Sequence, residues 1–332
     1  MAHDLNDLRW TGQRGWYEVH FLELTDAASG TGVWIRQTVH APADGEPECG
    51  VWFMASTRDG ARTAFKATLP ASALESASAP FRLACGDAEL TDGGMRGSAG
   101  GASWDLQWAP SAAPGVPVDP LVGRARIAKT MLAIPHPDLR ISGTVRFGDR
   151  ELALDGARGE QAHLWGTSHA ARWGWLHAAD LTTLAGEPCD ADWIDVVSVV
   201  VPRGGREIGP VTPVVGRLLG EEFAATGPLA LVRSRASFGL SALQVEARTR
   251  ARRVVVHASA PPPLQVGVRY DDPDGTNVWC ANTALGDARI WVWDRRAGAP
   301  GWLLRETLQA SGTAHVEYAQ RAPIPDVAVD AP

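Results

Sequence analysis

Residues 160–177 read EQAHLWGTSHAARWGWLH and hold three histidines, three tryptophans and one arginine. Apolar and polar residues alternate on both sides of the Gly-Thr-Ser at 166–168. A period of two is typical of a β-strand, because successive side chains point to opposite faces of the sheet. The stretch therefore predicts one strand over 159–166 and a second strand over 172–179.

Each predicted strand has one face that is rich in rings. The alternation groups Gln161, His163 and Trp165 on one face of the first strand, Glu160, Ala162 and Leu164 on its other face, and Trp173, Trp175 and His177 on one face of the second. If the two strands form a hairpin, the rings of both line one wall. Such large side chains are rarely left in water together, and buried imidazole nitrogens need hydrogen-bond partners or a polar ligand. We interpret the wall either as an aromatic core or as the lining of a pocket, to which His169 in the connecting loop adds a ligand contact.

The composition indicates a folded, acidic protein. The chain has 332 residues, of which 45% are hydrophobic and 21% are charged, so we expect a packed core rather than disorder. Its net charge of −7 argues against binding to nucleic acid or to an anionic membrane, since both require a basic surface. The opening MAHDLNDLRW lacks the pattern of a signal peptide, and no apolar run approaches the length of a membrane span. We therefore expect a soluble, cytoplasmic protein.

The same alternation recurs along most of the chain. Further strands are predicted over 16–24, 32–42, 50–58, 141–147, 193–201, 242–257, 264–270 and 288–293, each bounded by Gly, Pro, Asp or Asn. A helical period is scarce, and residues 215–224 are one of the few places where we expect it. The pattern predicts an all-β fold of two consecutive antiparallel barrels or half-barrels with little helix, one over 1–155 and the other over 156–332.

Metal ligation is the weaker interpretation of the histidines. His163, His169 and His177 could supply three ligands to zinc, but their spacing matches no zinc motif, so we predict no metal and no cofactor. The acidic stretch DDPDGTN at 271–277 suggests calcium, yet Pro273 breaks the order of ligands and a hairpin turn is favoured. No C-x-x-C pair is present, and we expect free, mostly buried thiols at Cys49, Cys85, Cys189 and Cys280.

The centre of the chain resembles a known family. The motifs S-G-x-V at 142–145, G-x-x-x-H-x-W-G at 159–166 and W-x-W at 173–175 follow one another in order. As an ordered set they resemble the lipocalin-like superfamily of AttH-like proteins, carotenoid 1,2-hydratases and tocopherol cyclases. The opening WYEVHFLEL at 16–24, followed by GVWIRQTVHAP at 32–42, is similar to the first hairpin of that family.

The resemblance implies two calycin-type barrels with a ligand site between or within them, and a hydrophobic, often isoprenoid, ligand. In the hydratases the His and Trp of H-x-W and a Tyr-x-Asp are associated with catalysis. Carried over to this chain, the first pair corresponds to His163 and Trp165. The second corresponds to Asp195, with Trp193 in place of Tyr. Gln161 departs from the hydratase pattern as well, which argues against carotenoid hydration itself and leaves the fold unaffected.

Three functions fit such a pocket. In the first, Asp195 is kept protonated by burial and protonates a double bond, while tryptophan rings stabilise the cation by up to about 2 kcal/mol. His163 or His177 then orients a water molecule or an internal hydroxyl group, which gives hydration or cyclisation. In the second, the chain is a carrier that binds and shields a hydrophobic ligand. In the third, a pocket of fixed shape folds a polyene for pericyclic ring closure without an acid. The sequence does not decide among the three.

Overall fold

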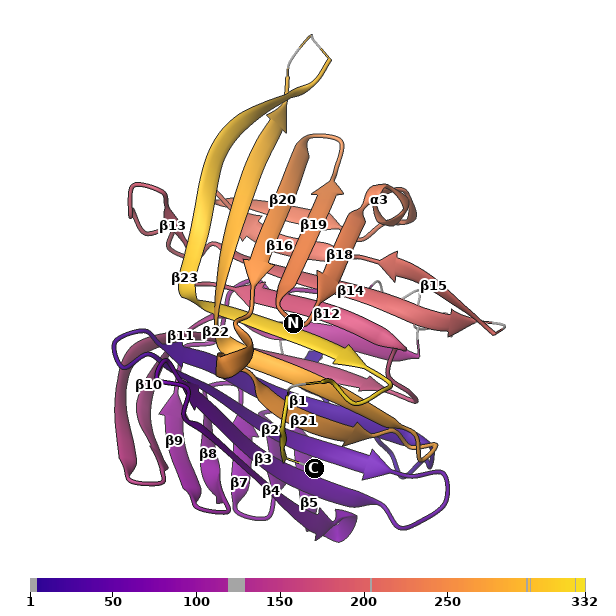
Figure 1. Cartoon of the computed structure of the whole chain (residues 1–332). Coiled ribbons are helices and arrows are strands. Elements are labelled where there is room, and N and C mark those ends of the chain that lie inside the picture. The colour runs from indigo at the N-terminus through magenta and orange to yellow at the C-terminus, as the bar shows by residue number, and fades with distance from the viewer. Residues whose placement is uncertain are drawn as a thin grey trace.

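The computed structural model describes residues 5–118, 129–203, 205–296, 298, 300–325 and 327–331. Across these residues β-strands dominate, and helices are short, such as α3 (Pro228–Arg233) and the 3-10 turns η1 (Ala71–Ala73) and η2 (Pro262–Leu264). The prediction of an all-β fold with little helix is confirmed. In the described part of the chain the strands form two large sheets, one of 11 and one of 13 strands (Figure 1).

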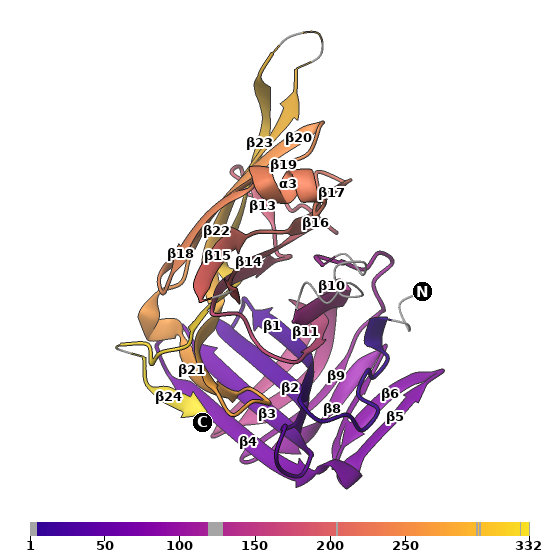
Figure 2. The ribbon, with the colours of Figure 1, turned by 90° about the vertical axis from the view of Figure 1, so that its right-hand side faces the viewer.

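The first sheet curls into a nearly closed barrel (Figure 2). In spatial order its strands are β4 (Arg62–Pro70), β3 (Glu48–Thr57), β2 (Thr31–Ala41), β1 (Trp16–Asp26), β11 (Arg150–Gly166), β10 (Thr130–Phe147), β9 (Ala102–Gln107), β8 (Gly94–Ala99), β7 (Ala88–Thr91), β6 (Phe81–Cys85) and β5 (Leu74–Ser78). The two edge strands, β4 and β5, are consecutive in the chain and are joined through η1, so the edges of the sheet are held near each other. The interior is an apolar core that includes Leu24, Phe53 and Trp104.

The second sheet is more open and carries long, curved strands. Its main path runs β17 (Glu221–Ala225), β16 (Val214–Leu218), β14 (Trp193–Arg203), β12 (Arg172–Ala178), β23 (Trp302–Gln320), β22 (Asn277–Arg295), β20 (Arg252–Ser259), β19 (Ala242–Arg248) and β18 (Arg235–Gly239). Beside this path lie β13 (Thr182–Thr183), β15 (Arg206–Val211), β21 (Val266–Asp271) and β24 (Val329–Ala331). The helical period expected at 215–224 is wrong. That segment forms the β16–β17 hairpin, because Phe223 and Ala225 of β17 alternate into the core of this sheet.

The chain leaves the barrel after Gly166. β11 pairs with β1 and β10, whereas β12 pairs with β14 and β23, so the hairpin suggested for 159–166 and 172–179 is wrong. The two strands belong to different sheets, and their ring-bearing faces therefore do not form one wall. β11 also crosses the expected boundary between residues 155 and 156, and the division into two domains stays a prediction.

A third core lies between the two sheets. Tyr17, Val19 and Phe21 of β1 point out of the barrel and pack with aromatic residues of the second sheet, among them Trp173 and Trp175. The other face of β1 contributes Leu22 and Leu24 to the barrel interior. Because β1 is covered on both faces, all nine of its central residues are buried.

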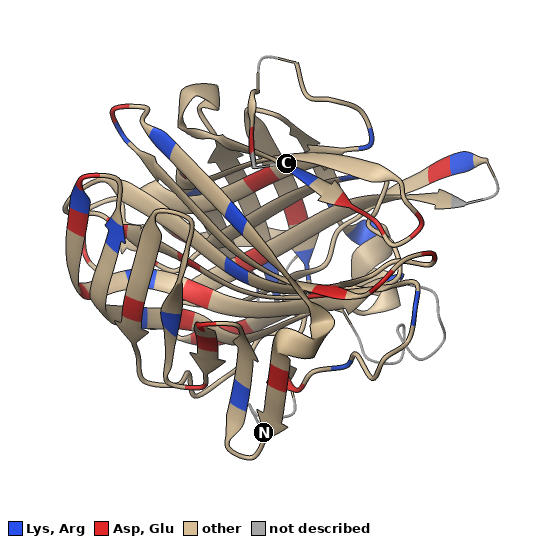
Figure 3. Ribbon diagram, turned by 90° about the horizontal axis from the view of Figure 1, so that it is seen from below, with Lys and Arg blue, Asp and Glu red and all other residues tan. Residues whose placement is uncertain are grey.

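The surface and the thiols agree with the composition. Seen from below, Lys and Arg are interspersed with Asp and Glu over the strands (Figure 3). Among the described residues, no helix is long and apolar enough to cross a membrane.

All four cysteines are free, as expected, and three are buried. The stretch 271–277 forms the turn between β21 and β22, as predicted.

The barrel core generates a first prediction. Phe53 has no exposed surface, and its ring centroid lies 5.9 Å from that of Trp104 and 5.5 Å from that of Phe147. Phe53→Ala leaves a cavity that this closed core cannot fill, so we expect the free energy of unfolding to fall by about 3–5 kcal/mol. Urea denaturation measures it. Val232→Ala on α3, where the side chain is 85% exposed, should change it by less than about 0.5 kcal/mol, and equal effects would contradict the assignment of the core.

Candidate functional site

The structure places the predicted site residues in three separate regions. Gln161, His163 and Trp165 face the inside of the barrel, against the N-terminal segment. His169 lies at the rim of the interface between the sheets. The remaining residues face that interface: Trp173, Trp175, His177, Trp193 and Asp195. The zinc site considered for His163, His169 and His177 is therefore wrong, because the three rings belong to three regions.

In the barrel, the N-terminal segment covers a polar patch. His163 contacts the carboxylate of Glu18 at 2.8 Å through Nε2 and the carbonyl oxygen of Leu5 at 2.6 Å through Nδ1. The His163 and His20 rings stack with centroids 3.8 Å apart. Gln161 donates to the side chain of Asn6 at 3.0 Å. These contacts tie the start of the chain to the barrel wall, and they occupy the ring nitrogens of His163.

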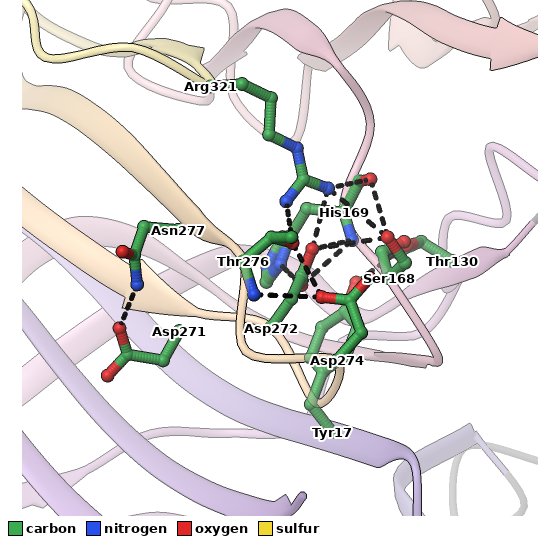
Figure 4. Close-up of polar contacts among 10 residues, drawn as sticks. All are labelled: Tyr17, Thr130, Ser168, His169, Asp271, Asp272, Asp274, Thr276, Asn277 and Arg321. Atoms are coloured by element: carbon green, nitrogen blue, oxygen red, sulfur yellow. Dashed lines mark hydrogen bonds and ion pairs between the residues drawn. The ribbon is translucent and has the colours of Figure 1, made fainter. Parts of the chain in front are cut away.

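At the rim, His169 is part of a clasp between three segments (Figure 4). Its Nδ1 lies 2.5 Å from the carboxylate of Asp272, which also contacts the Arg321 guanidinium at 2.6 Å. Burial alone would raise the pKa of Asp272, but the hydrogen bonds from His169 and the charge of Arg321 outweigh it and hold the pKa below its ordinary value. The His169 ring stacks on Tyr17 with centroids 4.3 Å apart. The clasp fixes the turn between β21 and β22 to the loop that precedes β12.

The interface holds a cluster of five buried ionisable residues, which we name the interface cluster: Glu23, Glu160, His177, Asp195 and His315. Each is at most 2% exposed. His177 Nδ1 lies 2.9 Å from Glu160 Oε2 and 3.5 Å from Asp195 Oδ2, so one imidazole ring joins the barrel to the second sheet. The Trp175 indole donates to Asp195 at 2.8 Å. Of these residues the sequence pointed to His177 and Asp195 and missed the other three.

Strand register explains why these side chains meet. Glu23 on β1 is the Cα partner of Glu160 on β11, so the two carboxyl groups point out of the barrel side by side. Gly159 allows this approach, because a Cβ at that position would collide with the carbonyl oxygen of Glu23. In the second sheet, His177 on β12 is the partner of both Asp195 on β14 and His315 on β23. The alternation of Glu23 with Leu22 and Leu24 was a signal in the sequence, but it could not show which strand lies opposite.

The interface cluster contains many polar atoms that lack hydrogen bonds. Within the described chain, both carboxylate oxygens of Glu23 and of Glu160, both ring nitrogens of His177 and Nδ1 of His315 have no well-aligned partner. Leaving such groups buried is costly, and in native proteins they mark water, an ion, or a site for a ligand. A ligand or a transferred proton that bonded to these atoms would therefore reduce the free-energy cost of burying them.

Burial divides the cluster into charged and neutral members. It raises the pKa of Glu23 well above its ordinary value, and the nearby charge of Glu160 adds to this shift. Burial also raises the pKa of Glu160 and of Asp195, although His177 opposes both shifts. For His177, burial lowers the pKa, but Glu160 and Asp195 outweigh it and raise the value to about 10. Burial and the charge of His177 keep the pKa of His315 well below its ordinary value. Near neutral pH, His177 is therefore cationic, Glu23 is an uncharged acid and His315 is an uncharged base.

The hydrogen bonds of Thr25 define the tautomer of His315. The Thr25 hydroxyl donates its proton to the carbonyl oxygen of Ala284 at 2.6 Å and lies 3.2 Å from His315 Nε2. A hydroxyl has one proton, so Nε2 of the neutral ring must carry hydrogen and donate to Thr25. Nδ1 of His315 then carries a free lone pair, and no group in the described chain occupies it.

Three groups of side chains place donor atoms within 4.8 Å of one another, as a metal site requires: Glu18, His20 and His163; Glu23, Glu160 and His315; Glu160, His177 and Asp195. The first is inside the barrel, and the other two share Glu160 in the interface cluster. Carboxylates with imidazoles are ligands that several divalent metals accept. The third set would fit such an ion once His177 had lost its proton.

An open cleft at the edge of the interface leads toward the interface cluster. It has a volume of about 50 Å³ and is lined on one side by Tyr17, Val19 and Arg36 of the barrel, and on the other by His169 and Tyr270. Rings connect its floor to the cluster. The Arg36 guanidinium lies 4.8 Å from the Trp34 ring, Trp34 lies 6.3 Å from Phe21, and Phe21 lies 6.0 Å from Trp175.

Comparisons with known proteins agree with this architecture. No protein-family model matches the chain. Two uncharacterized proteins of Mycobacterium tuberculosis, Rv0493c of strain H37Rv and MT0513 of strain CDC 1551, are each 28% identical over 321 residues, which is 94% of this chain and 89% of theirs. The crystal structure of a Nitrosomonas europaea protein assigned to AttH superposes with a TM-score of 0.54 at 11% identity and covers 92% of both chains. The chain thus has an AttH-like fold.

The charge on His177 can be tested directly. Because the folded protein keeps this proton up to a pKa of about 10, we expect ¹⁵N NMR of the imidazole to show a cationic ring at pH 8. Glu160→Gln removes the largest stabilising charge, so the pKa of His177 should fall in that variant. Glu46→Gln, at a side chain that is 94% exposed, should leave it unchanged. A neutral His177 ring at pH 7 in the wild type would refute the assignment of charges.

The raised pKa of Glu23 has a consequence for stability. Folded Glu23 keeps a proton that the unfolded chain releases above the ordinary value of 4.5, so the wild type should lose stability as the pH rises. Glu23→Gln has no such proton. Its free energy of unfolding relative to wild type should increase above that value, by up to about 1.4 kcal/mol per pH unit, in urea denaturation at several pH values. A difference that does not vary with pH would contradict a neutral Glu23.

Proposed function

We propose that this protein binds a hydrophobic small molecule between its two sheets and transfers a proton to it from Glu23. One observation carries the proposal: an uncharged acid, Glu23, and an uncharged base, His315, place a carboxyl oxygen and a ring nitrogen within 4.8 Å of each other, together with Glu160, where all three are buried. Groups whose pKa values are pushed apart in this way can act as acid and base at the same pH. The proposal moves the role of proton donor from Asp195 to Glu23, because Asp195 is engaged by Trp175 and His177.

The chemistry that fits is addition to a carbon–carbon double bond. Glu23 gives its proton to one alkene carbon, which leaves a carboxylate and a carbocation. The oxygen of water, or of a hydroxyl group in the same molecule, forms a bond to the cation and releases a proton to Nδ1 of His315. Return of this proton to Glu23 restores the starting state, and the net reaction is hydration or ring closure.

The surroundings suit a cationic intermediate. Trp175 and Trp193 lie beside His177, with ring centroids 6.4 Å and 6.2 Å from its ring. The faces of indole rings attract cations, by about 2 kcal/mol or more when water is excluded. The carboxylates of Glu160 and Asp195 add negative charge next to the same space.

Entry to the cluster requires side chains to move. Arg36 lines the cleft and contacts the Trp34 ring, and the Phe21 ring contacts both Trp34 and Trp175. Rotation of Phe21 and Trp34 connects the cleft to the interface cluster, and the ligand takes the place of these rings. A hydrophobic ligand fits this path because the lining is aromatic. The AttH-like fold is consistent with the lipocalin-like superfamily, whose ligands are of this class.

A carrier is the second candidate. Neither the cleft at Arg36 nor the larger one, about 500 Å³, beside His257 and Trp291 reaches the interface cluster. If the interface stays closed, a ligand is held at the edge and never meets Glu23. A pericyclase that works by shape alone would likewise not depend on this residue.

Turnover of a simple isoprenoid in heavy water separates the three. We expect the wild type to convert geraniol into a hydrated or cyclised product with one deuterium bound to carbon, detected by mass spectrometry. Glu23→Gln keeps the shape but cannot donate a proton, so the rate should fall about 100-fold or more. His315→Gln should slow the reaction as well.

The matched control is Glu46→Gln, which changes an exposed carboxylate and should react at the wild-type rate. Geraniol that is bound by the wild type but recovered without deuterium would reject proton transfer and favour the carrier. Conversion by Glu23→Gln at the wild-type rate would favour a function that depends on shape.

A further inference from the structure

We propose that the cleft beside Arg36 is a site for a carboxylate group, and that the hydrophobic molecule carries this group. The inference rests on the proposed function for the apolar part of the ligand, and on Arg36 for the anionic part. The evidence is a buried, unpaired guanidinium that borders an open space.

Arg36 is a buried cation for which the described residues provide no anionic partner. The residue is 4% exposed, and Nε and Nη1 are buried without a hydrogen bond. No carboxylate or carbonyl oxygen in the described chain pairs with this side chain. Buried charges in native proteins are paired or hydrogen-bonded, because an isolated one is costly. The site is therefore incomplete as it stands.

Aromatic rings surround the guanidinium and shape the site. Its central carbon lies 4.8 Å from the Trp34 ring, 5.4 Å from Trp52 and 4.5 Å from Tyr270. Such contacts stabilise the positive charge, yet they accept no hydrogen bonds from the edge of the guanidinium. Trp52 and Tyr270 hold the plane of Arg36 in place when Trp34 moves, and the N–H groups of Arg36 stay available for an oxygen ligand.

The cleft is also lined by two acids, which contact other side chains, and by a second cation, Lys66. Glu48 lies 3.7 Å from His40, and Asp271 accepts from Asn277 at 2.5 Å. The ammonium group of Lys66 lies 4.5 Å from the Trp52 ring, on the same side as Arg36. Neither of these two acids forms an ion pair with Arg36.

Size and charge select a carboxylate. A volume of about 50 Å³ holds a few water molecules or one such group. The planar fork of arginine matches two carboxylate oxygens with two parallel hydrogen bonds. A phosphate monoester is bulkier and carries close to two negative charges at neutral pH, which the nearby Glu48 and Asp271 disfavour. We therefore assign a singly charged carboxylate.

The position of the site sets the orientation of the ligand. Trp34 contacts both Arg36 and Phe21, and Phe21 contacts Trp175, which donates a hydrogen bond to Asp195 of the interface cluster. A carboxylate held at Arg36 directs the attached apolar chain along these rings toward Glu23. When one end of a flexible molecule is bound in this way, its other end is held near the acid. The entropy of bringing the two together is then lost on binding and not in the reaction step.

The test compares decanoate, decanol and decyl phosphate by isothermal titration calorimetry at neutral pH. We expect the wild type to bind decanoate at least about tenfold more tightly than decanol and more tightly than decyl phosphate. Arg36→Met replaces an unpaired buried charge by an apolar side chain of similar length, so the variant should fold, as circular dichroism would verify. Its preference for decanoate should disappear, while its affinity for decanol is kept. Arg62→Met, at a neighbouring arginine that bonds the Gln265 carbonyl oxygen at 2.9 Å, should retain the preference.

The outcomes distinguish the two proposals. Equal binding of decanoate and decanol by the wild type would overturn the carboxylate site and leave the apolar site intact. A preference that survives in Arg36→Met, or tighter binding of decyl phosphate, would also overturn it. If the wild type bound neither decanoate nor decanol, both proposals would fall. Should Arg36→Met not fold, the comparison of the three molecules on the wild type still decides.

Discussion

The contact between His177 and Glu160 across the two sheets is the constraint on which the chemistry of the interface depends. The imidazole of His177 and the carboxyl group of Glu160 lie 2.9 Å apart, and neither side chain is exposed to solvent. Removing an ion from water costs several kcal/mol unless an opposite charge compensates it. Asp195 is the second acid near this cation, at 3.5 Å. Glu23 keeps its proton because burial and the neighbouring acids raise its pKa by more than His177 lowers it.

The same interface explains why neither face of β1 is exposed to solvent. In a barrel that stood alone, Glu23 on β1 and Arg36 on β2 would point outward into water, as alternate residues of a barrel strand do. The second sheet covers this face and turns two ordinary surface charges into buried ones. The carboxyl group responds by keeping its proton. The guanidinium cannot release its proton. Its charge is stabilised instead by cation–π contacts with three aromatic rings.

Local pattern predicted the strands and their faces, and it could not predict their neighbours. The alternation at 159–166 and 172–179 correctly grouped Gln161 with His163 and Trp173 with Trp175. A short connection between two strands is typical of a hairpin, but here the chain passes from one sheet to the other. Glu23 and His315 lie in ordinary alternating strands, far from residues 160–177 in sequence. They join the site because β1 pairs with β11 and β23 pairs with β12, and such long-range pairing leaves no local signal.

Places where a sequence departs from the usual rules of stability tend to be functional. A protein selected for stability alone would have leucine or methionine at positions 23 and 36, since apolar side chains of similar volume replace buried charges without loss. Both positions instead hold ionisable groups without partners, on adjacent strands and on the same face of the barrel. One is an acid that can give a proton, and the other is a cation that can receive an anion. A molecule with an apolar body and one carboxylate would satisfy both, because its carboxylate would pair with the guanidinium and its apolar body would reach the acid.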